Sequence, residues 1–276
     1  MFAYTIPNRK MKKQVLKKTL NALIVLIIVA WVLSSCKNNK TEYFPLSSVT
    51  MKFAEELPAG TGDLHFYFVT DNEYECMNFP IRYELQSDDL GVNVYLKDVE
   101  EISTCLTPGG AAYADINIGN FLAGSYPLTI KVGDVENIGM LTVTESQCII
   151  TIDNPQMLTL LHDTVQRVPE DLIWGLVGYN LSSSAGVANA YLDSIQKVGA
   201  QPVELVPGDY GYFEIDTAGK IVAPDNLGYK YIKTYVYNYN QAWETLEEIV
   251  NYYSVYNPHT FIIYLYNSEG ERYSSY

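Results

Sequence analysis

The stretch FLAGSYPLTIKVGDVENIGMLTVTE, residues 121–145, decides the fold of the first half of the chain. Two runs rich in aliphatic and β-branched residues flank a short polar segment. A strand begins near Tyr126, and the chain then turns from Gly133 to Glu136. Gly139 begins the second run. Glycine and acidic residues between two such runs are typical of a β-hairpin, so the stretch predicts two adjacent antiparallel strands.

The residues before this hairpin repeat the same strand pattern. Further runs of alternating aromatic or β-branched residues are HFYFVT (65–70), PIRYELQ (80–86), VNVYLKDV (92–99) and AYADINIG (112–119). Turn residues separate them at intervals of about 8–12 residues, which is typical of an all-β sandwich or barrel. The hairpin resembles the closing hairpin of bacterial immunoglobulin-like modules, with Tyr126 in the place of their strand-entry tyrosine. The resemblance implies an immunoglobulin-like β-sandwich over residues 49–152, acting as a spacer or binding module.

Residues 153–276 change to a mixed pattern, which predicts an α+β domain. A connecting helix is expected over 155–168, with Asn154 as its N-cap. Apolar residues at helical spacing predict a second helix between Ser184 and Gly199 and a third over 241–253. Strands are expected at 172–179, 230–239 and 260–267, and a hairpin turn at 217–219.

The resulting order β-α-β-β-α-β resembles a ferredoxin-like split βαβ arrangement with an extra hairpin near Gly219. Leu172–Tyr179 and Phe261–Tyr266 are the most continuously apolar strands. We therefore expect these two strands in the centre of the sheet. The fold class expected for the whole chain is an immunoglobulin-like sandwich followed by this α+β domain.

Tyrosine is unusually abundant, with 24 residues in 276, and it is concentrated in the second half. Side chains alternate between the two faces of a strand, so the tyrosines of 229–239 share one face. We expect an aliphatic face to pack the helices and a tyrosine-rich face to be open. The residues expected to contact a ligand there are Tyr231, Tyr235, Tyr237, Tyr264 and Tyr266.

Three uses of a tyrosine face are compatible with its chemistry, because a tyrosine ring buries apolar area while its hydroxyl stays hydrogen-bonded. A glycan could stack on the rings, a protein partner could dock there, or the β-sandwich could cover the face. The sequence leaves these three alternatives open.

The N-terminus combines basic, apolar and small residues in a definite order. Lys12, Lys13, Lys17 and Lys18 precede an apolar run from Leu20 to Leu33, and two serines then lead to Cys36. A run of 14 residues is shorter than the roughly 20 needed to span a membrane, and the order of these parts is that of a secretory signal. LSSC resembles the lipobox of bacterial lipoproteins. The resemblance implies a signal peptide over 1–35, lipidation of Cys36, and a polar tether over 36–48.

The lysine-rich start, the lipobox and the polar tether resemble lipoproteins of Bacteroidota, which implies attachment to the outer membrane. The acidic stretch that often marks surface display after the cysteine is missing, so the surface and periplasmic faces both stay open. Residues 1–35 contain six basic and no acidic residues, so removing them changes the net charge from -14 to -20. Such a chain needs its lipid for membrane attachment and is unsuited to nucleic acid. The cysteines at 76, 105 and 148 permit one disulfide, and their spacing does not show which two pair.

Motifs for catalysis, cofactor binding and metal binding are absent from the sequence. His65, His162 and His259 lie far apart along the chain, and neither a nucleophile motif nor a nucleotide-binding motif occurs. We therefore expect no enzyme, no cofactor and no metal site. The expected function is that of a lipid-anchored cell-envelope binding protein. The alternatives are a glycan-capturing lipoprotein of a carbohydrate-uptake system and a fimbrillin-like structural subunit, although fimbrillins are mostly β in both halves.

Overall fold

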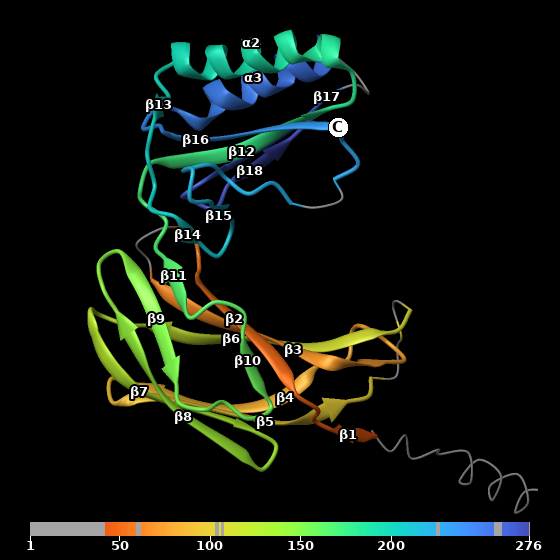
Figure 1. Ribbon diagram of the computed structural model, residues 1–276, viewed down its shortest axis with the longest axis vertical. Helices are drawn as coiled ribbons and strands as arrows, with labels where there is room; N and C mark the ends of the chain where they lie inside the picture. The colour runs from red at the N-terminus through yellow and green to blue at the C-terminus, as the bar shows by residue number, and fades with distance from the viewer. Residues whose placement is uncertain are drawn as a thin grey trace, which may run out of the picture. The chain divides into compact units, whose positions relative to one another are not determined.

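The computed structural model describes residues 42–58, 62–102, 105, 108–224, 227–256 and 261–275. Cys36 and the expected signal peptide lie outside these residues, as does His259. The described chain is mostly β, with several sheets and two α-helices (Figure 1). Among the described residues, no helix is long and apolar enough to cross a membrane.

Two sheets form from the first part of the chain, with a few short strands added from later segments. Sheet A has the order β1-β5-β7-β8-β9-β11-β14-β15, with β4 also on β5, and sheet B has the order β10-β2-β3-β6. The strands of sheet A are β1 (Tyr43–Pro45), β4 (Ile81–Asp88), β5 (Gly91–Glu100), β7 (Gly124–Val132), β8 (Val135–Val143), β9 (Gln147–Ile152), β11 (Thr164–Gln166), β14 (Gly208–Asp209) and β15 (Glu214–Ile215). The strands of sheet B are β2 (Val49–Glu55), β3 (Asp63–Tyr74), β6 (Gly110–Asn120) and β10 (Leu158–Leu160).

A single apolar core joins sheets A and B, because alternate residues of their strands point to the same interior. Met51, Phe66 and Phe68 of sheet B are fully buried in the same cluster as Leu96 and Ile130 of sheet A. Two sheets that bury alternate side chains against each other make a β-sandwich, which is the β-rich architecture expected for this half.

The hairpin expected at residues 121–145 is confirmed. Strands β7 and β8 pair antiparallel, with Val132 opposite Val135, so the turn consists of Gly133 and Asp134. Gly133 has a φ of 57°, a value that favours glycine and suits a two-residue hairpin turn. Strand β8 begins at Val135, earlier than the expected Gly139, because the short turn brings the next residues into the ladder at once.

The expected helix over 155–168 is wrong. This segment instead forms β10, parallel to β2, and β11, antiparallel to β9. Asn154 has a φ of 49°, in the left-handed region, whereas an N-cap residue has extended backbone angles. The open edges of two sheets offer backbone partners to this segment, and these outweigh the helical spacing of its apolar residues.

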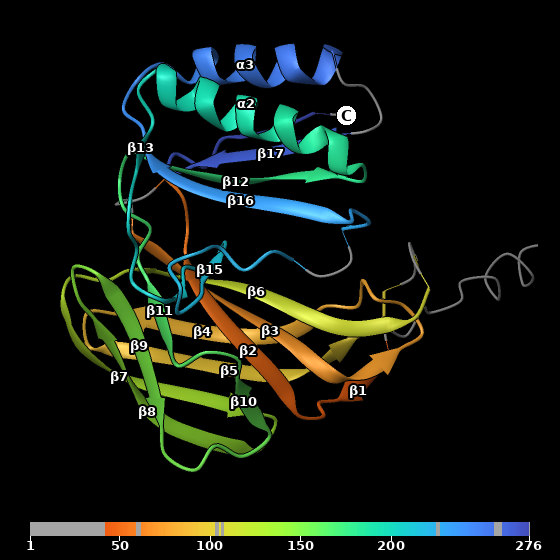
Figure 2. The same ribbon diagram turned by 45° about the horizontal axis from the view of Figure 1, so that its top comes forward.

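Sheet C is built from the last third of the chain, in the order β13-β16-β12-β17-β18, with every neighbouring pair antiparallel. The helices α2 and α3 lie side by side over one face of this sheet (Figure 2). The expected central strands are confirmed as interior strands, and all eight residues of β12 are buried. The elements are β12 (Leu172–Tyr179), a short 3₁₀ turn η1 (Ser182–Ser184), α2 (Ala185–Lys197), β13 (Gln201–Pro202), β16 (Tyr231–Asn238), α3 (Trp243–Tyr256), β17 (Phe261–Asn267) and β18 (Arg272–Ser274).

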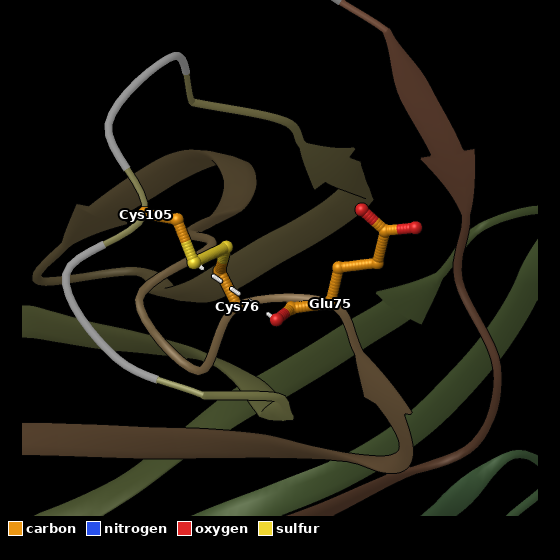
Figure 3. Close-up of a disulfide and its surroundings, with 3 residues drawn as sticks. All are labelled: Glu75, Cys76 and Cys105. Atoms are coloured by element: carbon orange, nitrogen blue, oxygen red, sulfur yellow. Dashed lines mark hydrogen bonds between the residues drawn. A yellow bond between two sulfur atoms is a disulfide. The ribbon is translucent and has the colours of Figure 1, made fainter.

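One disulfide joins Cys76 and Cys105, which lie in the connections after β3 and after β5 (Figure 3). Cys148 of β9 is a buried free thiol. Burial raises the pKa of this thiol to about 11. The structure therefore decides the pairing that the spacing left open.

Candidate functional site

The expectation that the tyrosine row of β16 forms an open face is wrong. Tyr235 and Tyr237 are buried, as is Tyr239 just after the strand. They share a cluster with Tyr191 of α2 and Leu246 of α3, and Tyr231 packs half-buried at its margin. These rings are the core between sheet C and its helices, so they cannot receive a ligand.

Strand register is the reason for this difference. Gly175 of β12 lies opposite Tyr235 on one side and Leu265 on the other, so these residues belong to the same face. The tyrosines of β16 therefore share the helix side with the aliphatic residues of β17, whereas Tyr264 and Tyr266 point to the other side. The five expected contact residues do not form one surface.

The buried tyrosines form a hydrogen-bonded chain across the sheet. The Tyr235 hydroxyl donates to the carbonyl of Tyr264 at 3.0 Å, and the Tyr191 hydroxyl lies 2.8 Å from that of Tyr235. Because Tyr235 gives its proton to the carbonyl, Tyr191 is the donor to Tyr235. A Cβ atom at Gly175 would lie 2.7 Å from the Tyr235 hydroxyl oxygen, so glycine makes room for the ring. Burial raises the pKa of both Tyr191 and Tyr235.

The opposite face of sheet C carries an aromatic pocket. Trp174 of β12 and Tyr266 of β17 stack with ring centroids 6.0 Å apart, and Tyr212 lies 6.4 Å from Trp174. Tyr212 belongs to the turn between β14 and β15, which packs on this face through Tyr210 and Phe213. The pocket encloses about 470 Å³, and its lining residues are Glu56, Leu57, Trp174, Tyr212, Tyr266, Asn267, Gly270, Glu271 and Arg272.

Tyr212 is the most exposed ring of this aromatic pocket, with 45% of its surface accessible. Its hydroxyl accepts a hydrogen bond from the Leu57 amide at 3.2 Å and donates one to the carbonyl of Glu55 at 3.1 Å. Both roles of the hydroxyl are therefore used by the protein. The ring is held in place and offers an apolar face.

Charged and amide groups complete the lining. Glu56 contacts His65 Nε2 at 3.1 Å, and the other ring nitrogen of His65 lies 2.7 Å from Asp115. Glu271 accepts a hydrogen bond from the Asn267 side chain at 2.7 Å. Glu56 and Glu271 each use one carboxylate oxygen for the protein contact, so the second oxygen of each can accept a hydrogen bond from a ligand.

A second pocket, of about 560 Å³, lies beside β11 and β14. It is lined by His162, whose Nε2 is 4.0 Å from the Asp209 carboxylate, and by Asp163 and Glu214. Among the described residues that line it there is no phenylalanine, tyrosine or tryptophan. Within the described part of the chain, no group of three or more histidine, cysteine, aspartate or glutamate residues is arranged to hold a metal ion.

Scans against protein-family models, curated proteins and solved structures gave no significant match to this chain.

Of the expected contact residues, only Tyr266 lines the aromatic pocket. Sequence analysis missed Glu56, Trp174, Tyr212 and Arg272, which come from separate segments. A signal for two of them was present. Trp174 is the aromatic interruption of an aliphatic strand, and Arg272 is one of only four arginines in the sequence.

Proposed function

We propose that this protein is a lipid-anchored envelope protein that binds a ligand, without catalysis, in the aromatic pocket on sheet C. The observation that carries the proposal is the pocket itself, in which Trp174, Tyr212 and Tyr266 are combined with a few charged side chains. Pockets of about 300–1,000 Å³ with aromatic walls and few polar groups are typical of small-ligand sites.

The disulfide supports export. Disulfides persist in oxidising compartments such as the bacterial periplasm or the cell surface, and Cys76 and Cys105 form one here. Together with the lipobox at Cys36, it favours an outer-membrane lipoprotein, facing either the surface or the periplasm. Attachment would come from the lipid, because the processed chain is strongly acidic.

The proposal includes a ferredoxin-like α+β domain and an immunoglobulin-like sandwich, and one observation supports each of them. The order β13-β16-β12-β17, with helices after β12 and β16, agrees with a ferredoxin-like split βαβ unit. The Tyr126 hydroxyl donates to the carbonyl of Leu122, four residues earlier, at 2.9 Å. Such a tyrosine corner is a feature of immunoglobulin-like sandwiches. Because fimbrillins are mostly β in both halves, the helices α2 and α3 count against the fimbrillin-like alternative.

Glycoside hydrolysis is a second candidate function, because one observation favours it. Glu56 and Glu271 line the same pocket, and glycosidases use two carboxylates placed across one cleft. We place this candidate second because each carboxylate is also engaged by a protein side chain, His65 for Glu56 and Asn267 for Glu271.

The anchor is tested by fatty-acid labelling and membrane fractionation of the full chain. We expect label in the wild-type protein, with the protein in the outer-membrane fraction. We expect neither the label nor this location for Cys36→Ala. Wild-type protein without a fatty acid would contradict the proposed anchor.

Ligand binding is tested by tryptophan fluorescence. Export would remove Trp31, so a Trp243→Phe variant keeps Trp174 as the one tryptophan of the processed chain. We expect its emission to change on titration with members of one ligand class among saccharides, peptides and lipids. An emission that none of these classes changes would contradict the proposed site.

A further inference from the structure

We infer that the ligand of the aromatic pocket is a neutral saccharide, bound with the apolar face of a sugar ring against Tyr212 and Tyr266. The inference rests on the proposed function and names the ligand class of the same pocket. Three features of the pocket lining lead to this inference. They are the aromatic rings, the hydrogen-bonding groups of Arg272 and the carboxylates, and the balance of positive and negative charge.

We expect Tyr212 and Tyr266 to contact the ligand through the faces of their rings. Both hydrogen-bonding roles of the Tyr212 hydroxyl are used by the Leu57 amide and the Glu55 carbonyl. Trp174 is only 4% exposed and supports Tyr266 by stacking on it at an interplanar angle of 15°. A π-face attracts C–H groups that carry partial positive charge, and the apolar face of a pyranose presents such groups. Because Tyr212 is already fixed, little rotational freedom is lost on binding.

Arg272 is the group most clearly available to a ligand. Three arginines lie in the described residues, and Arg82 and Arg167 each make two hydrogen bonds to one carboxylate, on Asp98 and Glu55. Arg272 forms no ion pair with any described residue. Its guanidinium carries five N–H donors, which match the hydroxyl oxygens of a sugar.

The charges of the lining select against ions. Glu56 and Glu271 would repel an anionic ligand, and the overall charge of the processed chain adds to this repulsion. Arg272 would in turn repel a cation that approached the rings. A neutral polyol avoids both penalties, because its hydroxyl groups can donate to the carboxylates and accept from the guanidinium.

The inference is tested by calorimetric titration of the full-length lipoprotein in a detergent without sugar headgroups. The probes are neutral oligosaccharides of hexoses and N-acetylhexosamines, with uronate-containing oligosaccharides of matched length for comparison. We expect at least one neutral series to bind, and its uronate counterpart to bind about tenfold or more weakly.

Three variants test whether the saccharide binds in the aromatic pocket. Tyr212→Ala removes a ring face and should weaken binding about tenfold, the usual size for one well-packed aromatic contact. Arg272→Ala should do the same, and its exposed side chain makes it the variant that keeps the fold if Tyr212→Ala does not. Tyr256→Ala is the matched control, because Tyr256 is 70% exposed on α3 and does not line the pocket. Binding unchanged by Arg272→Ala would overturn the inference.

The outcomes also separate this inference from the proposed function. If Trp174 fluorescence responds to peptides or lipids and neutral saccharides do not bind, the saccharide inference is wrong and the binding function stands. If no ligand class changes the Trp174 fluorescence, the saccharide inference and the proposed binding function are both wrong. Release of shorter saccharides, lost in Glu271→Gln, would support the ligand class and replace binding by hydrolysis.

Discussion

At the scale of single residues, Tyr235 is the most consequential side chain of sheet C. Tyr235→Phe would leave the fully buried Tyr191 hydroxyl without its acceptor and remove the bond to the Tyr264 carbonyl. We expect it to lower the free energy of unfolding by about 1–3 kcal/mol. Tyr191→Phe should cost less, about 0.5–1.5 kcal/mol, because Tyr235 keeps its carbonyl partner. Urea unfolding of both variants measures the difference, and the reverse order would contradict the assignment of Tyr191 as the donor to Tyr235.

Alkaline pH should destabilise the fold through buried tyrosines. Burial raises the pKa of Tyr191 and Tyr235, and burial together with the Asp115 charge raises that of Tyr67 to about 12. In the unfolded chain these groups ionise near pH 10. Their contribution to stability is therefore complete below about pH 10 and is lost as the pH rises towards the folded-state values. Urea unfolding across this range, followed by tyrosinate absorbance, should show unfolding and ionisation together. Stability that stays constant above pH 10 would contradict the prediction.

At the scale of elements, the connection between β9 and β10 depends on one buried amide. The Asn137 side chain donates to the carbonyls of Ile130 and Gln156 and accepts from the Gln156 amide at 2.7 Å. Asn137→Ala should cost about 1–3 kcal/mol of unfolding free energy. It should also speed hydrogen exchange at the Val49 amide, which donates to the Met157 carbonyl in the same connection.

The matched control for this element is Gln156→Ala. It keeps the backbone atoms that Asn137 binds and removes only an exposed side chain, so its effect should stay within about 0.5 kcal/mol. Equal losses from the two variants would show that the amide of Asn137 does not hold the connection.

At the scale of the whole molecule, the disulfide is the covalent constraint on the sandwich. It closes a loop between residues 29 positions apart, and replacing Cys76 and Cys105 together by alanine should cost about 2–4 kcal/mol of unfolding free energy. Alkylation followed by mass measurement should find one disulfide, with Cys148 reacting only after unfolding because it is buried. A native chain that alkylates at two or three cysteines would contradict this pairing.

Much of the element pattern could be predicted because it is local. Strand alternation at 121–145 and helical spacing at 185–197 and 243–256 depend on neighbours within a few residues, and the structure contains these elements. The same local pattern failed at 155–168, where distant sheet edges supplied partners. Little of the candidate site could be predicted, since only Tyr266 among the expected contacts lines the pocket.

By itself the sequence determined the hairpin strands of 121–145, the long strands of sheet C and the two described helices, because side-chain periodicity and turn residues act within one segment. It also predicts the export signal and the lipidated Cys36, which are read along the chain. Only the tertiary structure decided which face of sheet C is covered, because that depends on register between strands far apart in sequence. It alone brought Glu56, Trp174, Tyr212 and Arg272 into one pocket, since their proximity arises from packing between distant segments.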